Sequence, residues 1–174
     1  MEAKVLFNEE QRFKQWWLWL ILIAVALYFI YGFVQQIFIG KPFGDHPVSD
    51  LGITLLLLVP FGTLWLLWKV KLTTKICTDG IYYQYFPFHW KFHKITWEDV
   101  EKSYVRTYKP IIEYGGWGLR SGVFGKGQAF NVYGNIGLQL ELKNQKKLLI
   151  GTQKKYEIEK ALEQIKRNQS LDYE

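Results

Sequence analysis

Two long runs of residues without a charge constrain this chain more than any other feature of its sequence. Residues 15–40 contain no Asp, Glu, Lys or Arg over 26 positions, and residues 51–68 contain none over 18. A helix needs about 20 apolar residues to cross the hydrocarbon core of a bilayer, and 18 residues at 1.5 Å each reach about 27 Å. The sequence therefore predicts a transmembrane hairpin at 16–68, with spans at about 16–39 and 51–68 and an outer loop at 40–50.

Two other interpretations of these runs fit less well. A signal peptide has an apolar region of about 7–15 residues before a small-residue cleavage site, whereas the first run is longer and Lys41-Pro42-Phe43 follows it. A helical hairpin buried in a soluble protein is the second alternative. Tryptophans gather instead at the ends of the runs, as expected at the headgroup level of a bilayer. These tryptophans are Trp16, Trp17, Trp19, Trp65 and Trp68.

Basic residues around the runs predict the orientation of the hairpin. Three precede the first run and three follow the second, whereas the loop contains Lys41 beside two aspartates. Lys and Arg concentrate in cytoplasmic flanks. We therefore expect a multi-pass protein of the cytoplasmic (inner) membrane with both termini in the cytoplasm. The flanking basic residues are Lys4, Arg12, Lys14, Lys69, Lys71 and Lys75.

Residues 69–152 follow a two-residue period that is typical of half-buried strands. The clearest alternation is at Leu138–Lys143, and Asp79-Gly80 has the composition of a hairpin turn. About seven short strands between turns predict a small antiparallel barrel or sandwich. The predicted strands are 70–77, 81–86, 90–95, 100–108, 111–114, 128–133, 137–142 and 146–151.

One helix is predicted after the strands. Ile158, Ala161, Leu162 and Ile165 fall at the spacing of a single apolar stripe, opposite a charged face. Such a stripe has to be buried, and the open end of a barrel offers the apolar surface. We expect residues 169–174 to fray.

Four short segments of the chain carry distinctive residues: Thr78-Asp79-Gly80-Ile81, Ile95-x-Trp97-x-x-Val100, Glu113-Tyr114-Gly115-Gly116-Trp117-Gly118 and Leu148-Leu149-Ile150-Gly151-Thr152-Gln153. Together they resemble an uncharacterised family of bacterial membrane proteins, in which two transmembrane helices precede a pleckstrin-homology-like (PH-like) domain. The resemblance implies a membrane hairpin followed by an all-β PH-like barrel capped by a C-terminal helix, and it implies no activity. The predicted domains of this chain are then a cytoplasmic N-terminal segment at 1–15, the hairpin, and a cytoplasmic PH-like domain at 69–168.

Residues 113–137 hold eight of the fifteen glycines, together with Trp117, Arg120 and Lys126. Glycine lets backbone donors approach an anion, so one interpretation is a binding loop in which these three side chains contact a ligand or partner. The spacing matches neither a P-loop nor a dinucleotide fingerprint. The other interpretation is that the glycines serve bulges and tight corners, and the sequence leaves this choice open.

The region after residue 68 carries a formal charge of +7, from 18 basic and 11 acidic residues. Lys69, Lys71 and Lys75 follow a span directly, where each cation near an anionic leaflet contributes about 1 kcal/mol of binding. We expect these lysines to contact headgroups of the inner leaflet. A solvated surface is the alternative. The basic residues form no dense run, so we expect no nucleic-acid partner.

Residues for catalysis or metal binding are sparse. Cys77 is the single cysteine, and His89 and His93 have no third ligand nearby in sequence. Glu98 and Asp99 read as an exposed turn between strands. We expect no enzymatic activity, no cofactor and no metal.

The function predicted from sequence is a non-enzymatic, membrane-anchored interaction module that binds a membrane or cytosolic protein partner or anionic lipid headgroups. The alternative is an accessory or assembly subunit of a larger membrane complex, with close helix contacts through small residues. Those small residues are Gly32, Gly52, Gly62, Thr54 and Thr63.

Overall fold

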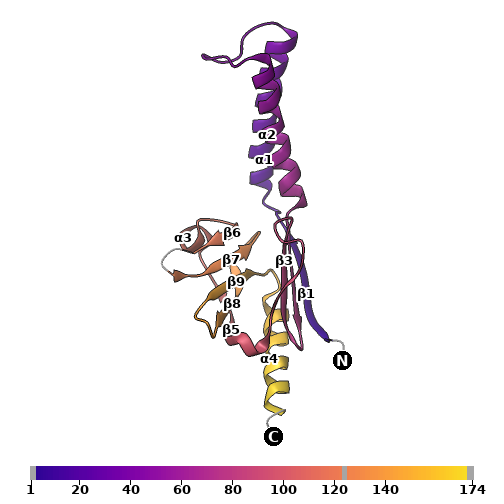
Figure 1. Ribbon diagram of the computed structural model, residues 1–174, viewed down its shortest axis with the longest axis vertical. Coiled ribbons are helices and arrows are strands. Elements are labelled where there is room, and N and C mark those ends of the chain that lie inside the picture. Colours follow the sequence, from indigo (N-terminus) through magenta and orange to yellow (C-terminus); the bar gives the residue numbers. More distant parts are fainter. Residues whose placement is uncertain (1–2, 123–124, 172–174) are drawn as a thin grey trace. The chain divides into compact units, whose positions relative to one another are not determined.

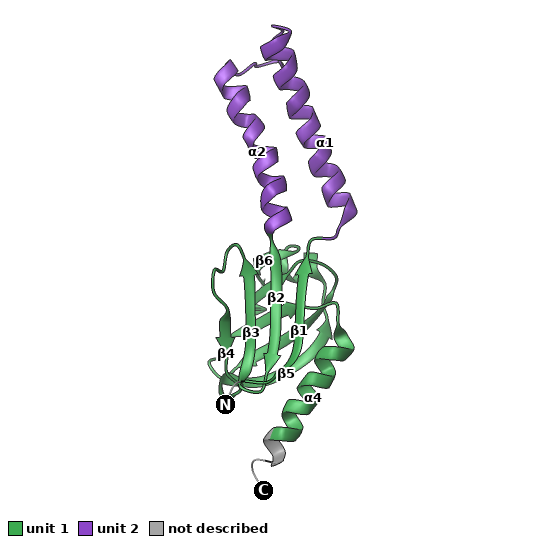
Figure 2. Ribbon diagram, turned by 90° about the vertical axis from the view of Figure 1, so that its right-hand side faces the viewer, with its two compact units in different colours: residues 1–13, 70–174 green, residues 14–69 purple. Residues whose placement is uncertain are grey.

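The computed structural model describes residues 3–122 and 125–171, which form two units (Figures 1 and 2). Residues 14–69 form the hairpin unit. Residues 1–13 join residues 70–174 in the second, which we call the β unit. The N-terminal segment expected to stand apart at 1–15 is thus largely a part of the β domain, and the hairpin is inserted between two segments of one folded unit.

Two long helices form the hairpin unit, as predicted. Helix α1 (Trp16–Phe33) continues into a π-helical turn, η1 (Val34–Phe38), and α2 spans Asp50–Lys69. Both are long and apolar enough to span a membrane, and only 11% of the most apolar window of each is buried. The core helix of a soluble protein would be mostly buried, so these helices present their apolar surface outward.

The turn between the helices is fixed by Gln36. Its amide Nε2 donates to the backbone oxygen of Val48 and to Asp50 Oδ1, both at 2.8 Å, and its Oε1 accepts the Phe43 N–H at 3.4 Å. The Phe43 ring covers Gly32, where a Cβ atom would lie 2.6 Å from the ring. Because Gly32 has no side chain, it leaves room for the Phe43 ring of the loop between the helices.

Strand β1 was missed by the sequence analysis. Val5–Arg12 pairs antiparallel with β2 (Lys71–Cys77), from Arg12 opposite Lys71 to Val5 opposite Cys77. The inward-facing residues of β1 are Phe7, Glu9 and Gln11, all buried. Because two of these three are polar, the strand lacks the apolar alternation that identifies a half-buried strand.

Two open sheets make up the β unit (Figure 2). The first has the order β1-β2-β3-β4, and the second has the order β5-β8-β9-β7-β6. All neighbours are antiparallel except β7 and β9, which are parallel. The further strands are β3 (Gly80–Phe86), β4 (His93–Ile95), β5 (Val100–Thr107), β6 (Gly118–Ser121), β7 (Gln128–Asn131), β8 (Ile136–Leu142) and β9 (Lys147–Gly151).

The expected closed, wholly antiparallel barrel is therefore wrong. Strand β4 has three residues and pairs only with β3, after which a short 3₁₀ helix, η2 (Trp97–Asp99), leads into the second sheet. No strand among the described residues joins β4 to β5. Strands β4 and β5 are therefore both edges of their sheets. The prediction failed because the number and composition of strands do not encode which edges meet.

The predicted strand at 111–114 is a helix, α3 (Pro110–Tyr114). Proline is favoured in the first turn of a helix, and Gly115 ends α3 with a φ of +70°, which glycine adopts at little cost. Ile111 and Ile112, the first two residues of the predicted strand, are exposed. The short strand β6 was also missed, because none of its four residues is buried and no pattern marks it.

The core lies between the two sheets and beneath the C-terminal helix, α4 (Lys155–Leu171). Phe130 of β7 packs against Tyr83 and Tyr85 of β3, with ring centroids 5.0 and 6.2 Å apart. The predicted apolar stripe of α4 is confirmed: Ile158, Ala161, Leu162 and Ile165 are all buried. The helix runs past the expected end at residue 168, and residues 172–174 lie outside the described part.

Two buried polar side chains of β1 bind the last residue of β9 and the segment after it. Gln11 Nε2 donates to the Gly151 oxygen at 2.6 Å, and Glu9 Oε2 accepts the Thr152 hydroxyl at 2.7 Å. The Glu9 Oε1 atom accepts the Gln153 N–H at 2.9 Å. Burial raises the pKa of Glu9 despite these bonds, which lower it in part. The N-terminal strand is thus tied to residues 140 or more positions away in sequence.

Candidate functional site

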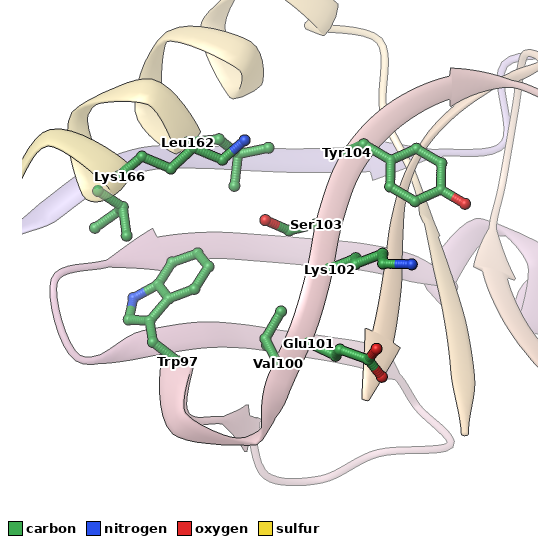
Figure 3. A pocket seen from close by; sticks show the side chains of 9 residues that line it. Trp97, Val100, Glu101, Lys102, Ser103, Tyr104, Leu162 and Lys166 are labelled. Carbon is green, nitrogen blue, oxygen red and sulfur yellow. The ribbon is translucent and has the colours of Figure 1, made fainter. Parts of the chain in front are cut away.

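A groove runs between β5 and α4 (Figure 3). Its volume is about 390 Å³, within the usual range for small ligand pockets. Figure 3 shows Ser103 of β5 between its own strand and Leu162 of α4, with Trp97 of η2 closing the lower end. The groove therefore combines a strand, an apolar helix face and an indole ring.

Strand β5 supplies an unpaired edge to this groove. It pairs with β8 on one side, and no other strand of the described chain pairs with it. An edge strand presents backbone N–H and C=O groups that an additional strand can bind. The Trp97 indole is held in place by a hydrogen bond from its Nε1 to the Cys77 backbone oxygen, at 2.9 Å.

The charges around the groove are mixed. Lys102 and Lys166 lie among the lining residues with Glu101. The Lys102 ammonium is 3.9 Å from Glu141 Oε2, and the Lys102 side chain is 63% exposed, so this pair holds it weakly. The lining is therefore weakly basic.

A second group of charged residues centres on Glu113 of α3. Arg106 of β5 donates from two guanidinium nitrogens to its carboxylate, at 2.9 and 3.3 Å, and the Lys109 N–H donates at 2.8 Å. Burial alone would raise the pKa of Glu113, but these bonds and the charges of Arg106 and Lys126 outweigh it and lower the pKa to about 2. Glu113 is thus a fixed anion that joins α3 to β5.

Each of the three side chains predicted as a contact site has a partner within the protein. The Trp117 indole donates from Nε1 to the Gly134 oxygen at 2.8 Å. The Arg120 Nε donates to the backbone oxygen of Trp117 at 3.1 Å, and the Lys126 ammonium lies 3.4 Å from Glu113 Oε2. Each is engaged by its own surroundings, and Arg120 and Lys126 remain exposed.

Glycines of residues 113–137 serve the fold at several positions. Gly127 has a φ of +81°, and a Cβ atom there would collide with the backbone oxygen of Lys147 in β9. Gly134 has a φ of +77° beside the Gln153 amide. These positions favour the structural interpretation of the glycine-rich segment, of which residues 123–124 lie outside the described part.

A second hollow of about 380 Å³ lies near Arg106 and Lys126. Its other lining residues include Gln139, Glu141 and Lys147. Arg106 is already bound by Glu113 and by Gln139, whose Oε1 accepts its Nε proton at 3.0 Å. Because its central cation is paired within the protein, this hollow is a poorer binding site than the groove.

The three lysines predicted to contact the inner leaflet have different surroundings. Lys69 ends α2, with its ammonium 4.7 Å from the centroid of the Trp68 ring. Lys71 pairs with Glu10 at 3.0 Å, and this hydrogen bond, with another from Arg12, lowers the pKa of Glu10. The Lys75 ammonium lies 5.0 Å from the centroid of the Phe92 ring.

Histidine and cysteine, which often serve in catalysis and metal binding, are few in this chain. No group of three or more His, Cys, Asp or Glu in the described ranges could hold a metal ion. His89 and His93 do meet, with ring centroids 4.2 Å apart, and burial together with the nearby His93 lowers the pKa of His89. Cys77 is buried, and its burial raises the pKa of its thiol.

A family model described as "Family of unknown function (DUF6141)" matches residues 1–165. The chain belongs to this family. The DUF6141 match includes β1, the hairpin, both sheets and most of α4, and therefore both segments of the β unit. Membership of an uncharacterised family, expected from the sequence motifs, is thereby confirmed, whereas the bacterial origin and the PH-like domain stay predictions. No curated protein and no solved structure matches the chain.

The groove of this DUF6141 member was not predicted from sequence. Leu162 and Ile165 stood out as an apolar stripe, but their partners on β5 could not be inferred. A run of aromatic residues at 86–92 was also overlooked. Its composition, Phe-Pro-Phe-His-Trp-Lys-Phe, was the available signal.

Proposed function

We propose that the chain is a non-enzymatic, membrane-anchored interaction module whose β unit binds an extended segment of a protein partner along β5. The observation that carries this proposal is the groove of about 390 Å³ beside the unpaired edge of that strand. A peptide added to a sheet edge gains affinity from main-chain hydrogen bonds and specificity from side-chain pockets. Strand β5 offers the main-chain hydrogen bonds, and the α4 face offers the side-chain pocket.

The lining of the groove indicates the chemistry of the bound segment. Leu162 and Trp97 provide apolar surface for one inserted side chain, and Lys102 and Lys166 outnumber Glu101 among the charged lining residues. The segment that fits is extended, with an apolar residue flanked by acidic residues. Opposite charges at the rim of such an interface contribute mainly to specificity and the rate of association.

Membrane anchoring through both helices is part of this proposal, as is the PH-like character of the β unit. Two sheets packed on each other and a C-terminal helix support that fold assignment. Arg12 and Lys71 pair within one sheet, so the chain leaves and re-enters the same sheet on either side of the hairpin. With both helices crossing the bilayer, the two termini would lie on one side and the loop between the helices on the other.

The test is a selection of peptides on the intact chain in detergent micelles, from a library of extended segments with varied apolar and acidic positions. We expect enrichment of peptides with an apolar residue flanked by acidic ones. The Ser103→Arg variant places a long cationic side chain in the groove and should reduce binding at least tenfold, a loss of about 1.4 kcal/mol. The Ser121→Arg variant changes the other edge strand of the same sheet and should bind normally.

Equal binding by the Ser103→Arg and Ser121→Arg variants would place the peptide elsewhere and contradict the proposal. Failure to enrich any peptide would contradict it too. The accessory-subunit alternative would gain support from a stable heteromeric band in native electrophoresis that survives the Ser103→Arg substitution.

A further inference from the structure

An exposed group of aromatic side chains projects from the connection between β3 and β4. We call residues 86–92 the aromatic loop. Trp90 is 80% exposed, Phe88 57% and Phe92 41%. None of these three side chains contributes to the buried core, and the groove beside β5 does not include them. The fold and the proposed peptide site therefore leave this surface unexplained.

The aromatic loop is held in place by its own contacts. The His89 N–H donates to the Tyr85 oxygen at 2.8 Å, and Gln84 Nε2 donates to the Trp90 oxygen at 3.0 Å. The rings of Phe86 and Trp90 meet edge to face, with centroids 5.8 Å apart. The exposed rings are thus presented from a fixed backbone.

The loop adjoins the strand that continues from the second span. Phe86 pairs with Lys71, and Val70 alone separates Lys71 from the last residue of α2. If α2 crosses a bilayer, its end reaches the interface, so the sheet begins there. The register of β2 and β3 then brings the aromatic loop to the same end of the sheet.

The charge of this region suits an anionic surface. No acidic residue lies between Asp79 and Glu98, whereas Lys91 lies within the aromatic loop and Lys75 stands over the Phe92 ring. Asp79 is itself paired with Lys94 at 2.6 Å. Tryptophan and phenylalanine with interspersed lysine are the composition of segments that settle at the headgroup level of a bilayer.

We propose that the aromatic loop docks the β unit on an anionic bilayer surface by inserting Phe88 and Trp90 at the headgroup level. This inference rests on the membrane anchoring proposed above, and it is independent of peptide binding at β5. It moves the main lipid contact from Lys69, Lys71 and Lys75 to Phe88 and Trp90. Lys71 is paired with Glu10, and Lys75 contributes through its position over Phe92.

The test uses the intact chain carrying Cys77→Ala, reconstituted in phosphatidylcholine vesicles with and without a quarter of phosphatidylglycerol. Single nitroxide labels are placed at Phe88→Cys, at Ile23→Cys within α1, and at Lys143→Cys. Lys143 is the control, because its N–H donates to the backbone oxygen of Asp99, the last residue of η2. The Trp97 indole of η2 in turn donates to the oxygen of Cys77 at the far end of β2. Accessibility to oxygen and to an aqueous nickel chelate is measured by electron paramagnetic resonance.

We expect the label at residue 88 to be severalfold less accessible to the nickel chelate than the label at residue 143, with a larger difference in anionic vesicles. Adding Trp90→Ser and Lys91→Ser should return residue 88 to aqueous accessibility. Equal aqueous accessibility at residues 88 and 143, with residue 23 in the hydrocarbon, would overturn loop docking and leave the anchor intact. An aqueous residue 23 would overturn the anchor and docking together.

Discussion

A chain in which Asn-Gly replaces residues 14–69 is expected to fold into a soluble β unit. Arg12 and Lys71 are already paired in adjacent antiparallel strands, and Asn-Gly is the preferred two-residue turn between such strands. Phe13 and the buried Val70 are retained on either side of the new turn. We expect a cooperative thermal transition in circular dichroism and a dispersed amide spectrum in nuclear magnetic resonance.

The matched control is the segment 70–171 without β1, which we expect to show no cooperative transition. Removing β1 takes away the buried Phe7, the bond of Gln11 to Gly151 in β9 and the bond of Glu9 to Thr152 after it. It also uncovers the edge of β2. Since a domain of this size is stable by about 5–15 kcal/mol, loss of a whole strand with its core residue is expected to remove most of that margin. If the segment 70–171 unfolded at the same temperature as the chain with Asn-Gly in place of residues 14–69, β1 would not be needed for the fold. That result would contradict the prediction.

The second large effect is expected at the Arg106–Glu113 pair. Their side chains are 23% and 14% exposed, and removing one partner of a partly buried pair leaves an uncompensated charge. We expect Arg106→Ala to lower the free energy of unfolding by about 3 kcal/mol. The control is Lys126→Ala, whose ammonium contacts the same carboxylate but is 49% exposed, with an expected loss below about 1 kcal/mol. Both are measured by denaturant unfolding of the intact chain in micelles.

The same pair predicts a dependence of stability on pH. The pKa of Glu113 falls from 4.5 to about 2 on folding, so its contribution is complete above about pH 4.5 and is lost as the pH falls toward 2. This shift corresponds to at most about 3 kcal/mol. The raised pKa of Glu9 changes stability with pH in the opposite direction. Because Glu9 is present in both proteins, its effect cancels in the difference in unfolding free energy between the wild type and Glu113→Gln. A difference between these two proteins that does not shrink on acidification would contradict the role given to Glu113.

The elements that follow from local physics were predictable from sequence. Two uncharged runs identified α1 and α2, and the alternation at Leu138–Lys143 identified β8, because membrane insertion and half-burial leave a mark on consecutive residues. The stripe of α4 followed from its helical period. In each case the pattern needs no knowledge of distant partners.

The remaining features depend on partners that local patterns do not reveal. Strand β1 buries Glu9 and Gln11 because Thr152 and Gly151 lie opposite them, a match visible only in the folded chain. Pairing of β7 with β9 and the open edge of β5 are likewise decided by tertiary packing. The Trp117 indole belongs to the binding-loop interpretation of the glycine-rich segment, and its bond to the Gly134 oxygen is another contact that the sequence does not reveal.

The central claim is that two membrane-spanning helices are inserted between adjacent strands of one β unit, so that this unit and the loop between the helices lie on opposite sides of a membrane. The most direct test is labelling with a membrane-impermeant maleimide of intact cells that express the chain with Cys77→Ala and either His46→Cys or Lys143→Cys. Both residues are exposed. We predict that residue 46 reacts in intact cells and residue 143 reacts only after permeabilisation. Reaction of both residues from the same side would contradict the account.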